Sequence, residues 1–226
     1  MEFLILLVSL FSFLFILHYY VRDDFVIFRK NVSLEDVFNI AFMSFILVFL
    51  SSRLLYIVEN PSPVYINPLV FLAVFYYPGL ALTGGIIGGG LFVIWYVKRK
   101  KFPGKRILDF FSIATLWAIN IYSLLYIILL RKFFLETILQ GALFFALLGI
   151  FSLFLIPKYL AGKIKDGFLT GFFCIGYSLI SLVSLFLGKR DLPGIIFETA
   201  FLIIIFSLGL IFILKEQLAP KIKDLK

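Results

Sequence analysis

Apolar runs of about 20 residues alternate with short polar connections along almost the whole chain. Runs of that length match the hydrocarbon thickness of a bilayer when they form helices. Strands of a barrel would alternate apolar and polar residues with a period of two, and these runs do not. We therefore predict an all-α integral membrane protein with seven transmembrane helices. Their expected bounds are residues 3–20, 34–57, 79–97, 107–130, 133–156, 167–187 and 194–214.

The third predicted helix is glycine-rich and follows an outer segment that is broken by prolines. Four prolines interrupt the connection from Asn60 to Pro78. Its apolar stretch, residues 69–77, is too short to span and is expected to lie at, or dip into, the outer face. The helix itself has two overlapping GxxxG patterns, which favour close packing against a neighbouring helix. They are formed by Gly84, Gly85, Gly88 and Gly89.

Two predicted helix starts carry polar residues that are typical of caps. Ser33, followed by Glu35 and Asp36, is expected to cap the second helix. Asp109 lies just inside the fourth helix, after two cations. We predict that its carboxylate stabilises the N-terminus of its own helix within an interfacial cluster of ion pairs.

The composition agrees with a membrane protein of one domain. Apolar residues make up 62% of the chain and charged residues 15%, whereas soluble domains have about half and a quarter. Seven spans and their connections account for nearly all of the 226 residues. Residues 1–226 are therefore expected to form a single multi-pass transmembrane domain.

The distribution of lysine and arginine predicts which side of the membrane each connection faces. Of the 21 cations, 16 lie in one alternating set of connections, four lie in the other set, and one lies within a span. The 16 occupy residues 21–33, 98–106, 157–166 and the tail from residue 215. Cationic connections stay in the cytoplasm, so this set is expected inside. The N-terminus is then outside and the C-terminus inside.

Several other classes of function are disfavoured. The formal charge of +8 does not indicate nucleic acid binding, because the cations lie between apolar runs and not on one aromatic-rich face. The single histidine, His18, and the single cysteine, Cys174, lie far apart, which argues against a zinc site. The glycine run lacks the ending of a nucleotide phosphate loop. We expect no metal, no cofactor and no nucleic acid partner.

Arg53 is the one cation within a predicted span. It lies about five residues, or roughly 7 Å, from the outer end of the second helix. A charge in hydrocarbon needs a partner. The simplest interpretation is a side chain that extends to the headgroups at the surface. Glu59, Glu136 and Glu198 are alternative partners, and any of them would make Arg53 structural.

Other polar groups are expected at a matching depth near the outer leaflet. Thr83, Gly84 and Gly85 lie inside the outer end of the third helix, Glu136 lies near the start of the fifth, and Glu198 near the start of the seventh. Arginine offers forked donors, and glycine lets a backbone approach a ligand closely. The set therefore predicts a site for the phosphate of an anionic phospholipid, lined by Arg53 and the two glycines.

Four stretches resemble the prolipoprotein diacylglyceryl transferases, which move a diacylglyceryl group from phosphatidylglycerol to a lipobox cysteine. FLSSRLLYIV, residues 49–58, is similar to the family's second-helix pattern, with Arg53 and Tyr56 at its arginine and tyrosine. GLALTGGIIG, residues 79–88, is similar to the family's G-x-S-F-H-G-G-x-x-G segment. LETILQG, residues 135–141, is similar to its L-Y-E segment, and residues 167–191 follow its sixth-helix frame and retain Tyr177.

The chain departs from these motifs where the family carries charge. Thr83 occupies the position of the family's histidine before the paired glycines. Ser123 occupies the arginine position of the fourth-helix signature GRxGN, and Tyr126 its asparagine position. In the sixth helix, Ser181 and Leu185 occupy the positions of an arginine and a glutamate. The catalytic residues are therefore unassigned.

The resemblance implies a bacterial cytoplasmic (inner) membrane protein with seven helices, N-terminus out and C-terminus in. It implies a phosphatidylglycerol-like phospholipid and a lipoprotein precursor peptide as partners. Three functions stay open: a divergent transferase, an inactive protein of the same fold that binds lipid or precursor, and an unrelated carrier or assembly subunit. A cation near Ser123 or Ser181 would favour the first. The implied lipid-binding residues are Arg53, Tyr56, Thr83, Gly84, Gly85, Glu136 and Tyr177.

Overall fold

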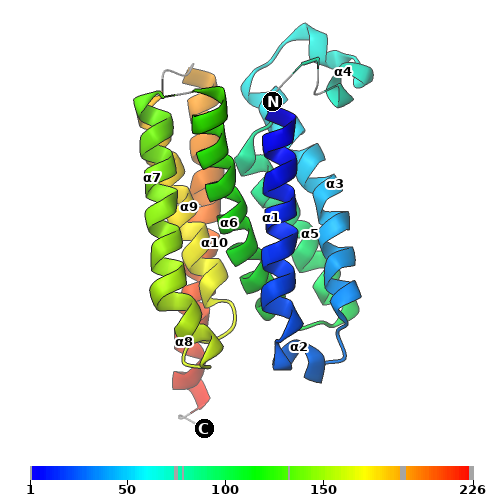
Figure 1. The fold of residues 1–226 in the computed structure, drawn as a ribbon, viewed down its shortest axis with the longest axis vertical. Helices are drawn as coiled ribbons and strands as arrows, with labels where there is room; N and C mark the ends of the chain where they lie inside the picture. The colour runs from blue at the N-terminus through cyan, green and yellow to red at the C-terminus, as the bar shows by residue number, and fades with distance from the viewer. Residues whose placement is uncertain (1, 74–75, 78, 132, 189–191, 224–226) are drawn as a thin grey trace.

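The computed structural model describes residues 2–73, 76–77, 79–131, 133–188 and 192–223 (Figure 1). Within these ranges the chain is helical and contains no strand. Pro78, Lys132, Lys189 and Arg190, which entered the sequence predictions, lie outside them. The elements are α1 (Glu2–Arg22), α2 (Phe25–Arg29), α3 (Leu34–Glu59), η1 (Pro63–Ile66), α4 (Pro68–Leu72), α5 (Leu82–Lys100), α6 (Gly104–Leu130), α7 (Leu135–Ile150), η2 (Phe151–Leu155), α8 (Ile156–Leu160), α9 (Phe168–Leu187) and α10 (Leu192–Lys223).

Six segments of the described chain are long and apolar enough to cross a membrane. The third predicted span is indeed a helix, α5, and it lies among the others in Figure 1. Its glycines and its three terminal cations lower its hydropathy, so it is not one of the six. The six are α1, α3, α6, the continuous segment Leu135–Leu160, α9 and Gly194–Lys215 of α10. The number of seven crossings stays a prediction.

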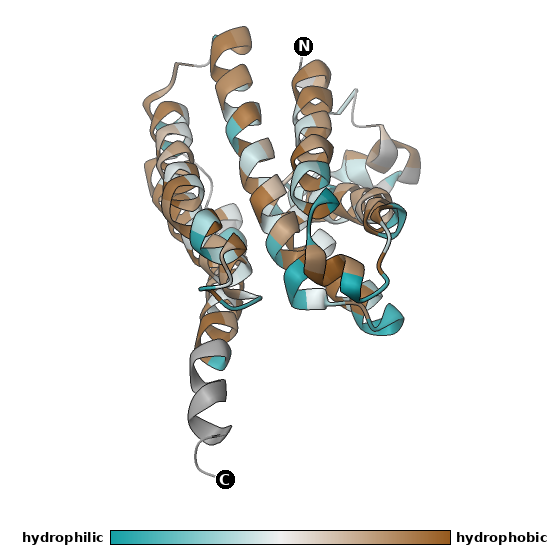
Figure 2. Ribbon diagram, turned by 60° about the horizontal axis from the view of Figure 1, so that its bottom comes forward, coloured by the Kyte–Doolittle hydropathy of each residue, from teal (hydrophilic) through white to brown (hydrophobic). Residues whose placement is uncertain are grey.

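The helices run side by side, and α1 begins at the opposite end of the bundle from the end of α10 (Figure 1). We call the end where α1 begins, which is expected to be external, the outer end, and the opposite one the inner end. Figure 2 shows apolar residues along most of the helices and hydrophilic residues gathered near the inner end. The orientation in the membrane stays a prediction from the charge count.

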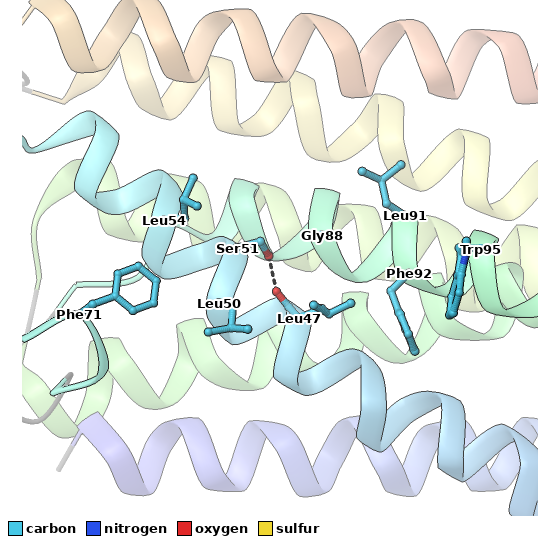
Figure 3. Close-up of a pocket in the computed structure, with 9 residues that line it drawn as sticks. All are labelled: Leu47, Leu50, Ser51, Leu54, Phe71, Gly88, Leu91, Phe92 and Trp95. Carbon is cyan, nitrogen blue, oxygen red and sulfur yellow. Dashed lines mark hydrogen bonds between the residues drawn. The ribbon is translucent and has the colours of Figure 1, made fainter. Parts of the chain in front are cut away.

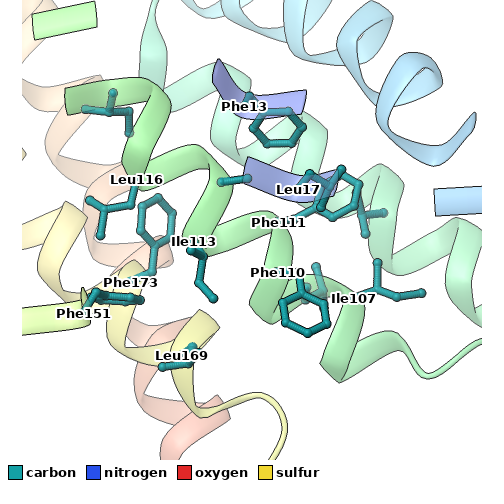
Figure 4. Close-up of a cluster of buried hydrophobic side chains, with 14 of the residues drawn as sticks. Phe13, Leu17, Ile107, Phe110, Phe111, Ile113, Leu116, Phe151, Leu169 and Phe173 are labelled. Atoms are coloured by element: carbon teal, nitrogen blue, oxygen red, sulfur yellow. The ribbon is translucent and has the colours of Figure 1, made fainter. Parts of the chain in front are cut away.

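The core of the bundle is built around α6. This helix packs against α1 on one side and against α7 and α9 on another. Figure 4 shows the cluster, in which the ring of Phe13 on α1 meets that of Phe111 on α6 edge to face at 5.6 Å. Leu169 and Phe173 of α9 are also buried there. Packing through α6 therefore joins the two halves of the chain.

The glycine-rich helix α5 packs closely on α3, as the GxxxG patterns predict. A Cβ atom added to Gly84 would lie 2.5 Å from the carbonyl oxygen of Ser51, and one added to Gly85 would lie 2.5 Å from Oγ of Ser52. A Cβ on Gly89 would lie 2.6 Å from Val48. Real side-chain atoms do not come that close, so only glycine permits this approach. The packing prediction is confirmed, with α3 as the partner.

The predicted cap of α3 is confirmed. The backbone N–H of Asp36 donates to Oγ of Ser33 at 3.1 Å, and the backbone N–H of Ser33 donates to the Asp36 carboxylate at 3.0 Å. This reciprocal pair satisfies two N–H groups at the helix start.

Asp109 was predicted to stabilise the start of its own helix, α6, and this prediction is wrong, because the residue caps α9 instead. Its carboxylate accepts hydrogen bonds from the backbone N–H of Gly167 at 2.6 Å and of Thr170 at 2.8 Å, at the start of α9. The chain enters α9 through Gly167 at φ +98°, which brings this helix start onto α6. Because Asp109 is fully buried, it needs donors, and the exposed N–H groups of α9 supply them. The ion-pair cluster nearby joins Arg106 to Asp24 and Asp166.

Candidate functional site

The guanidinium of Arg53 is enclosed by the outer segment that precedes α5. Its side chain has no exposed surface. Nε donates to the carbonyl oxygen of Phe71 at 3.0 Å, Nη1 to that of Gly79 at 2.8 Å, and Nη2 to that of Val70 at 3.3 Å. The alternatives weighed from the sequence were a lipid phosphate, a headgroup at the surface or a glutamate. The observed partners are instead backbone carbonyls, so phosphate binding by Arg53 requires this segment to move and stays a prediction.

Two tyrosines complete the enclosure. The guanidinium carbon of Arg53 lies 5.7 Å from the ring centre of Tyr56 and 5.1 Å from that of Tyr65, within the range of cation–π contacts. Gly79 fits beneath Tyr56 because it has no side chain: a Cβ would lie 2.1 Å from the ring. Its φ of +146° is also accessible mainly to glycine. Tyr56, expected at a lipid site, therefore packs on Arg53 in this structure.

A second polar centre lies deeper in the bundle, where α5 meets α9. The hydroxyls of Thr83 and Tyr177 lie 3.0 Å apart and share a hydrogen bond. Both side chains are almost completely buried, and Ser181 also hydrogen-bonds to Tyr177. The rings of Phe144 and Phe173 stack against Tyr177 at 6.0 and 6.1 Å. Three positions that the sequence singled out are thus brought together inside an aromatic shell.

This centre continues toward the outer end along one face of α9. Tyr177, Ser181 and Ser184 follow one another at helical spacing, and Ser184 donates to a carboxylate oxygen of Glu136 at 3.4 Å. We call Thr83, Tyr177, Ser181, Ser184 and Glu136 the polar track. Glu59 and Glu198 act electrostatically on Tyr177, so carboxylates of three helices lie around the track.

The remaining predicted site residues lie elsewhere. Gly84 and Gly85 face α3, as described above. Ser123 faces α7, because a Cβ atom added to Gly141 of that helix would lie 3.7 Å from the Cβ atom of Ser123. Arginines with described ion pairs or side-chain hydrogen bonds include Arg53, which the outer segment encloses, and Arg22 and Arg106, which lie at the inner end. Within the described ranges, no group of three or more His, Cys, Asp and Glu side chains could hold a metal ion.

Sequence reasoning missed an apolar groove between α3 and α5. Its volume is about 850 Å³, and Figure 3 shows the residues around it. Leucines at helical spacing are expected on any surface that faces lipid. Those that line the groove therefore do not distinguish it in the sequence. It is lined by Leu47, Leu50, Ser51, Leu54, Phe71, Gly88, Leu91, Phe92 and Trp95.

These features define a class: a multi-pass helical membrane protein with a buried polar track in its outer half and an apolar groove on its surface. The family model of prolipoprotein diacylglyceryl transferase matches residues 4–124, which is more than half of the chain. The chain therefore belongs to the prolipoprotein diacylglyceryl transferase family. The matched residues include Arg53, Thr83 and Ser123, whereas Glu136 and Tyr177 lie beyond them. No curated protein and no solved structure matches the chain.

Proposed function

We propose that this chain is a divergent prolipoprotein diacylglyceryl transferase. It takes phosphatidylglycerol from the outer leaflet of a bacterial inner membrane and transfers the diacylglyceryl group to the cysteine thiol of a lipobox. The observation that carries the proposal is the family match over residues 4–124. The hydrogen bond between Thr83 and Tyr177 supports it, because it joins two positions of the resembling motifs across 94 residues of sequence.

The reaction sets clear chemical requirements. The cysteine sulfur forms a bond to the terminal glycerol carbon, and the bond between that carbon and the phosphate oxygen breaks. Glycerol phosphate leaves with the electron pair, and the thiol proton passes to a base. Glu136 is the carboxylate that the polar track offers as this base, since it lies at the outer end where a precursor peptide would arrive. The leaving phosphate requires a cation, and Arg53 could serve only after the outer segment has moved.

A second function is favoured by a specific observation. The hydroxyls of Thr83 and Ser181 both hydrogen-bond to that of Tyr177, and each of the three guanidinium nitrogens of Arg53 donates to a backbone carbonyl. Removing one electrostatic stabiliser typically slows an enzyme by about 10²- to 10³-fold. A family member with this arrangement could bind phosphatidylglycerol or a lipoprotein precursor without transferring anything.

A complementation assay distinguishes the transferase from the protein that only binds lipid or precursor. The chain is expressed in bacterial cells depleted of their own transferase, and the phospholipid that co-purifies with it is measured. Rescue of growth with lipidated precursor supports the transferase. Failure of rescue with phosphatidylglycerol still bound supports the binding function, and loss of both overturns both proposals.

A matched pair of variants tests the polar track. Tyr177→Phe removes the hydroxyl that bonds to Thr83, whereas Tyr122→Phe removes a partly exposed hydroxyl on α6. If the track takes part in transfer, Tyr177→Phe lowers the lipidation rate by at least about tenfold at unchanged protein level, and Tyr122→Phe does not. Equal lipidation rates in both variants would remove the track from the mechanism.

A further inference from the structure

The two short helices of the outer segment, η1 and α4, pack mainly on each other and only sparsely on the long helices. Figure 1 shows α4 at the outer end of the bundle. Leu69 of α4 is exposed to 75% and Val64 of η1 to 46%. Parts of a protein that have few buried apolar contacts open most easily. We call residues 63–72, which comprise both short helices, the lid.

Arg53 of α3 contacts both helices of the lid. Its Nη2 donates to the carbonyl oxygen of Val70 at 3.3 Å and its Nε to that of Phe71 at 3.0 Å, both in α4. Its guanidinium carbon lies 5.1 Å from the ring centre of Tyr65 in η1. The ring of Tyr65 also meets that of Tyr56 on α3 edge to face at 6.4 Å. One charged side chain thus holds both short helices to α3.

The charge of Arg53 meets only neutral acceptors in its three described hydrogen bonds, although its side chain has no exposed surface. A buried cation is better stabilised by an opposite charge. A phosphate supplies that charge and accepts two parallel N–H bonds from one guanidinium. The guanidinium lies near the outer start of α5, because Nη1 donates to Gly79, three residues before Leu82. A phosphate of the outer leaflet would therefore compete with the lid for the same donors.

We propose that the lid is closed on Arg53 and that an anionic phosphate opens it, by taking the N–H groups that now bind the carbonyls of Val70 and Phe71. A ligand shifts a conformational equilibrium only as far as it prefers one state. The phosphate prefers the open state, because the closed lid occupies these N–H groups. The choice of a phosphatidylglycerol headgroup as the source of the phosphate rests on the proposed function, whereas the closed contact between Arg53 and the lid does not.

The chain that follows the lid has its own attachments to α3. Nη1 of Arg53 donates to the carbonyl oxygen of Gly79 at 2.8 Å, and the backbone N–H of Ala81 donates to that of Ser52 at 3.0 Å. Both bonds lie outside the lid, next to the closely packed glycines of α5. Opening is therefore a local movement that leaves the packing of α5 on α3 intact.

Hydrogen exchange at the amides of Val70, Phe71 and Ala73 reports opening of the lid. These amides donate to carbonyls in and next to α4, and a helix of five residues does not persist in water by itself. The protein is kept in dodecyl maltoside micelles, which contain no phosphate, and phosphatidylglycerol is added. Diacylglycerol with the same acyl chains is the control without phosphate, and glycerol phosphate is the control without acyl chains.

Exchange at the three amides should rise with the phosphatidylglycerol concentration, by about tenfold or more before it levels off, because the lipid binds the open form. Diacylglycerol should leave it unchanged. Exchange in the middle of α6 should not respond to any of the three compounds, which shows that the rest of the bundle stays folded.

Variants identify the residue that receives the phosphate. Arg53→Leu should exchange fast from the start and should not respond to phosphatidylglycerol. Should this variant not fold, Tyr65→Leu is the second test, because it removes a ring from the lid and keeps the guanidinium. Exchange without lipid should then rise by about two- to fivefold, and less phosphatidylglycerol should open the lid. Tyr76→Leu, at a tyrosine outside the lid that is exposed to 85%, is its matched control and should change neither quantity.

Each outcome supports or overturns the proposal. Exchange that does not respond to phosphatidylglycerol overturns it, and so does an equal response to diacylglycerol, since the acyl chains would then open the lid. An equal response to glycerol phosphate supports it with free phosphate as the source. A response that persists in Arg53→Leu overturns it, because another residue would receive the phosphate. Lid opening without rescue in the complementation assay removes the transferase alone, and rescue without lid opening removes the lid alone.

Discussion

Replacing Arg53 by leucine should release the outer segment from the bundle. The side chain makes three hydrogen bonds to carbonyls of this segment, at residues 70, 71 and 79, and a cation–π contact to Tyr65 in η1. Leucine fills part of the same volume but donates nothing. The three carbonyls then lose their donor from α3, and the segment keeps only its other contacts to this helix, such as that of Tyr65 with Tyr56.

The size of the effect follows from these contacts. Side-chain hydrogen bonds in membrane proteins contribute about 0.6 to 1.7 kcal/mol each. Three of them give about 2 to 5 kcal/mol, and the cation–π contact adds about 0.5 to 1 kcal/mol. The free energy of local opening should fall by the total, about 2.5 to 6 kcal/mol, which corresponds to faster amide exchange by about 60- to 20,000-fold.

Hydrogen exchange of the protein in bilayer nanodiscs measures this directly. The amides of Val70, Phe71 and Ala73, which bond within and around α4, should exchange faster in Arg53→Leu, whereas those in the middle of α6 should not change. Arg22→Gln, which removes an exposed arginine paired with Asp23, is the control and should leave both regions unchanged. Unchanged exchange at α4 in Arg53→Leu would refute the reasoning, because it would mean that other contacts hold the segment.

Three further predictions concern the fold. A tag at the C-terminus should be protected from protease added outside intact cells, and a tag at the N-terminus should be cleaved, because the connections rich in lysine and arginine are expected inside. Cleavage of the C-terminal tag would contradict the predicted topology. Gly88→Leu should lower stability in detergent by at least about 1 to 3 kcal/mol, whereas Gly90→Leu, where a Cβ meets nothing within 4 Å, should be nearly neutral; equal thermal unfolding of the two would contradict the packing. Asp109→Asn should lower the free energy of unfolding by about 1 to 3 kcal/mol. The two carboxylate oxygens of Asp109 accept from the backbone N–H groups of Gly167 and Thr170, whereas an amide has only one oxygen that can accept. The exposed Asp23→Asn is its control, and equal unfolding temperatures would remove the capping role.

The hydrophobic pattern by itself determined where the helices lie, because backbone hydrogen bonding in hydrocarbon is local to each segment. The expected second span, residues 34–57, and the observed α3, Leu34–Glu59, differ only at the outer end. The cap at Ser33 was also readable, since its partner Asp36 lies in the same turn. The glycine run showed that α5 packs closely on a neighbour, because a missing side chain is a property of the sequence alone.

Only the tertiary structure decided which groups meet. The carbonyls that bind Arg53 lie 17, 18 and 26 residues further along the chain. The backbone N–H of Gly167, which donates to Asp109, lies 58 residues from it in sequence. Residues at similar depth, such as Glu136, were equally plausible partners from the sequence. Depth is determined by position in a span, but contact depends on the rotation of each helix and on the path of the connections. That path brought backbone carbonyls to Arg53 and left a groove between α3 and α5.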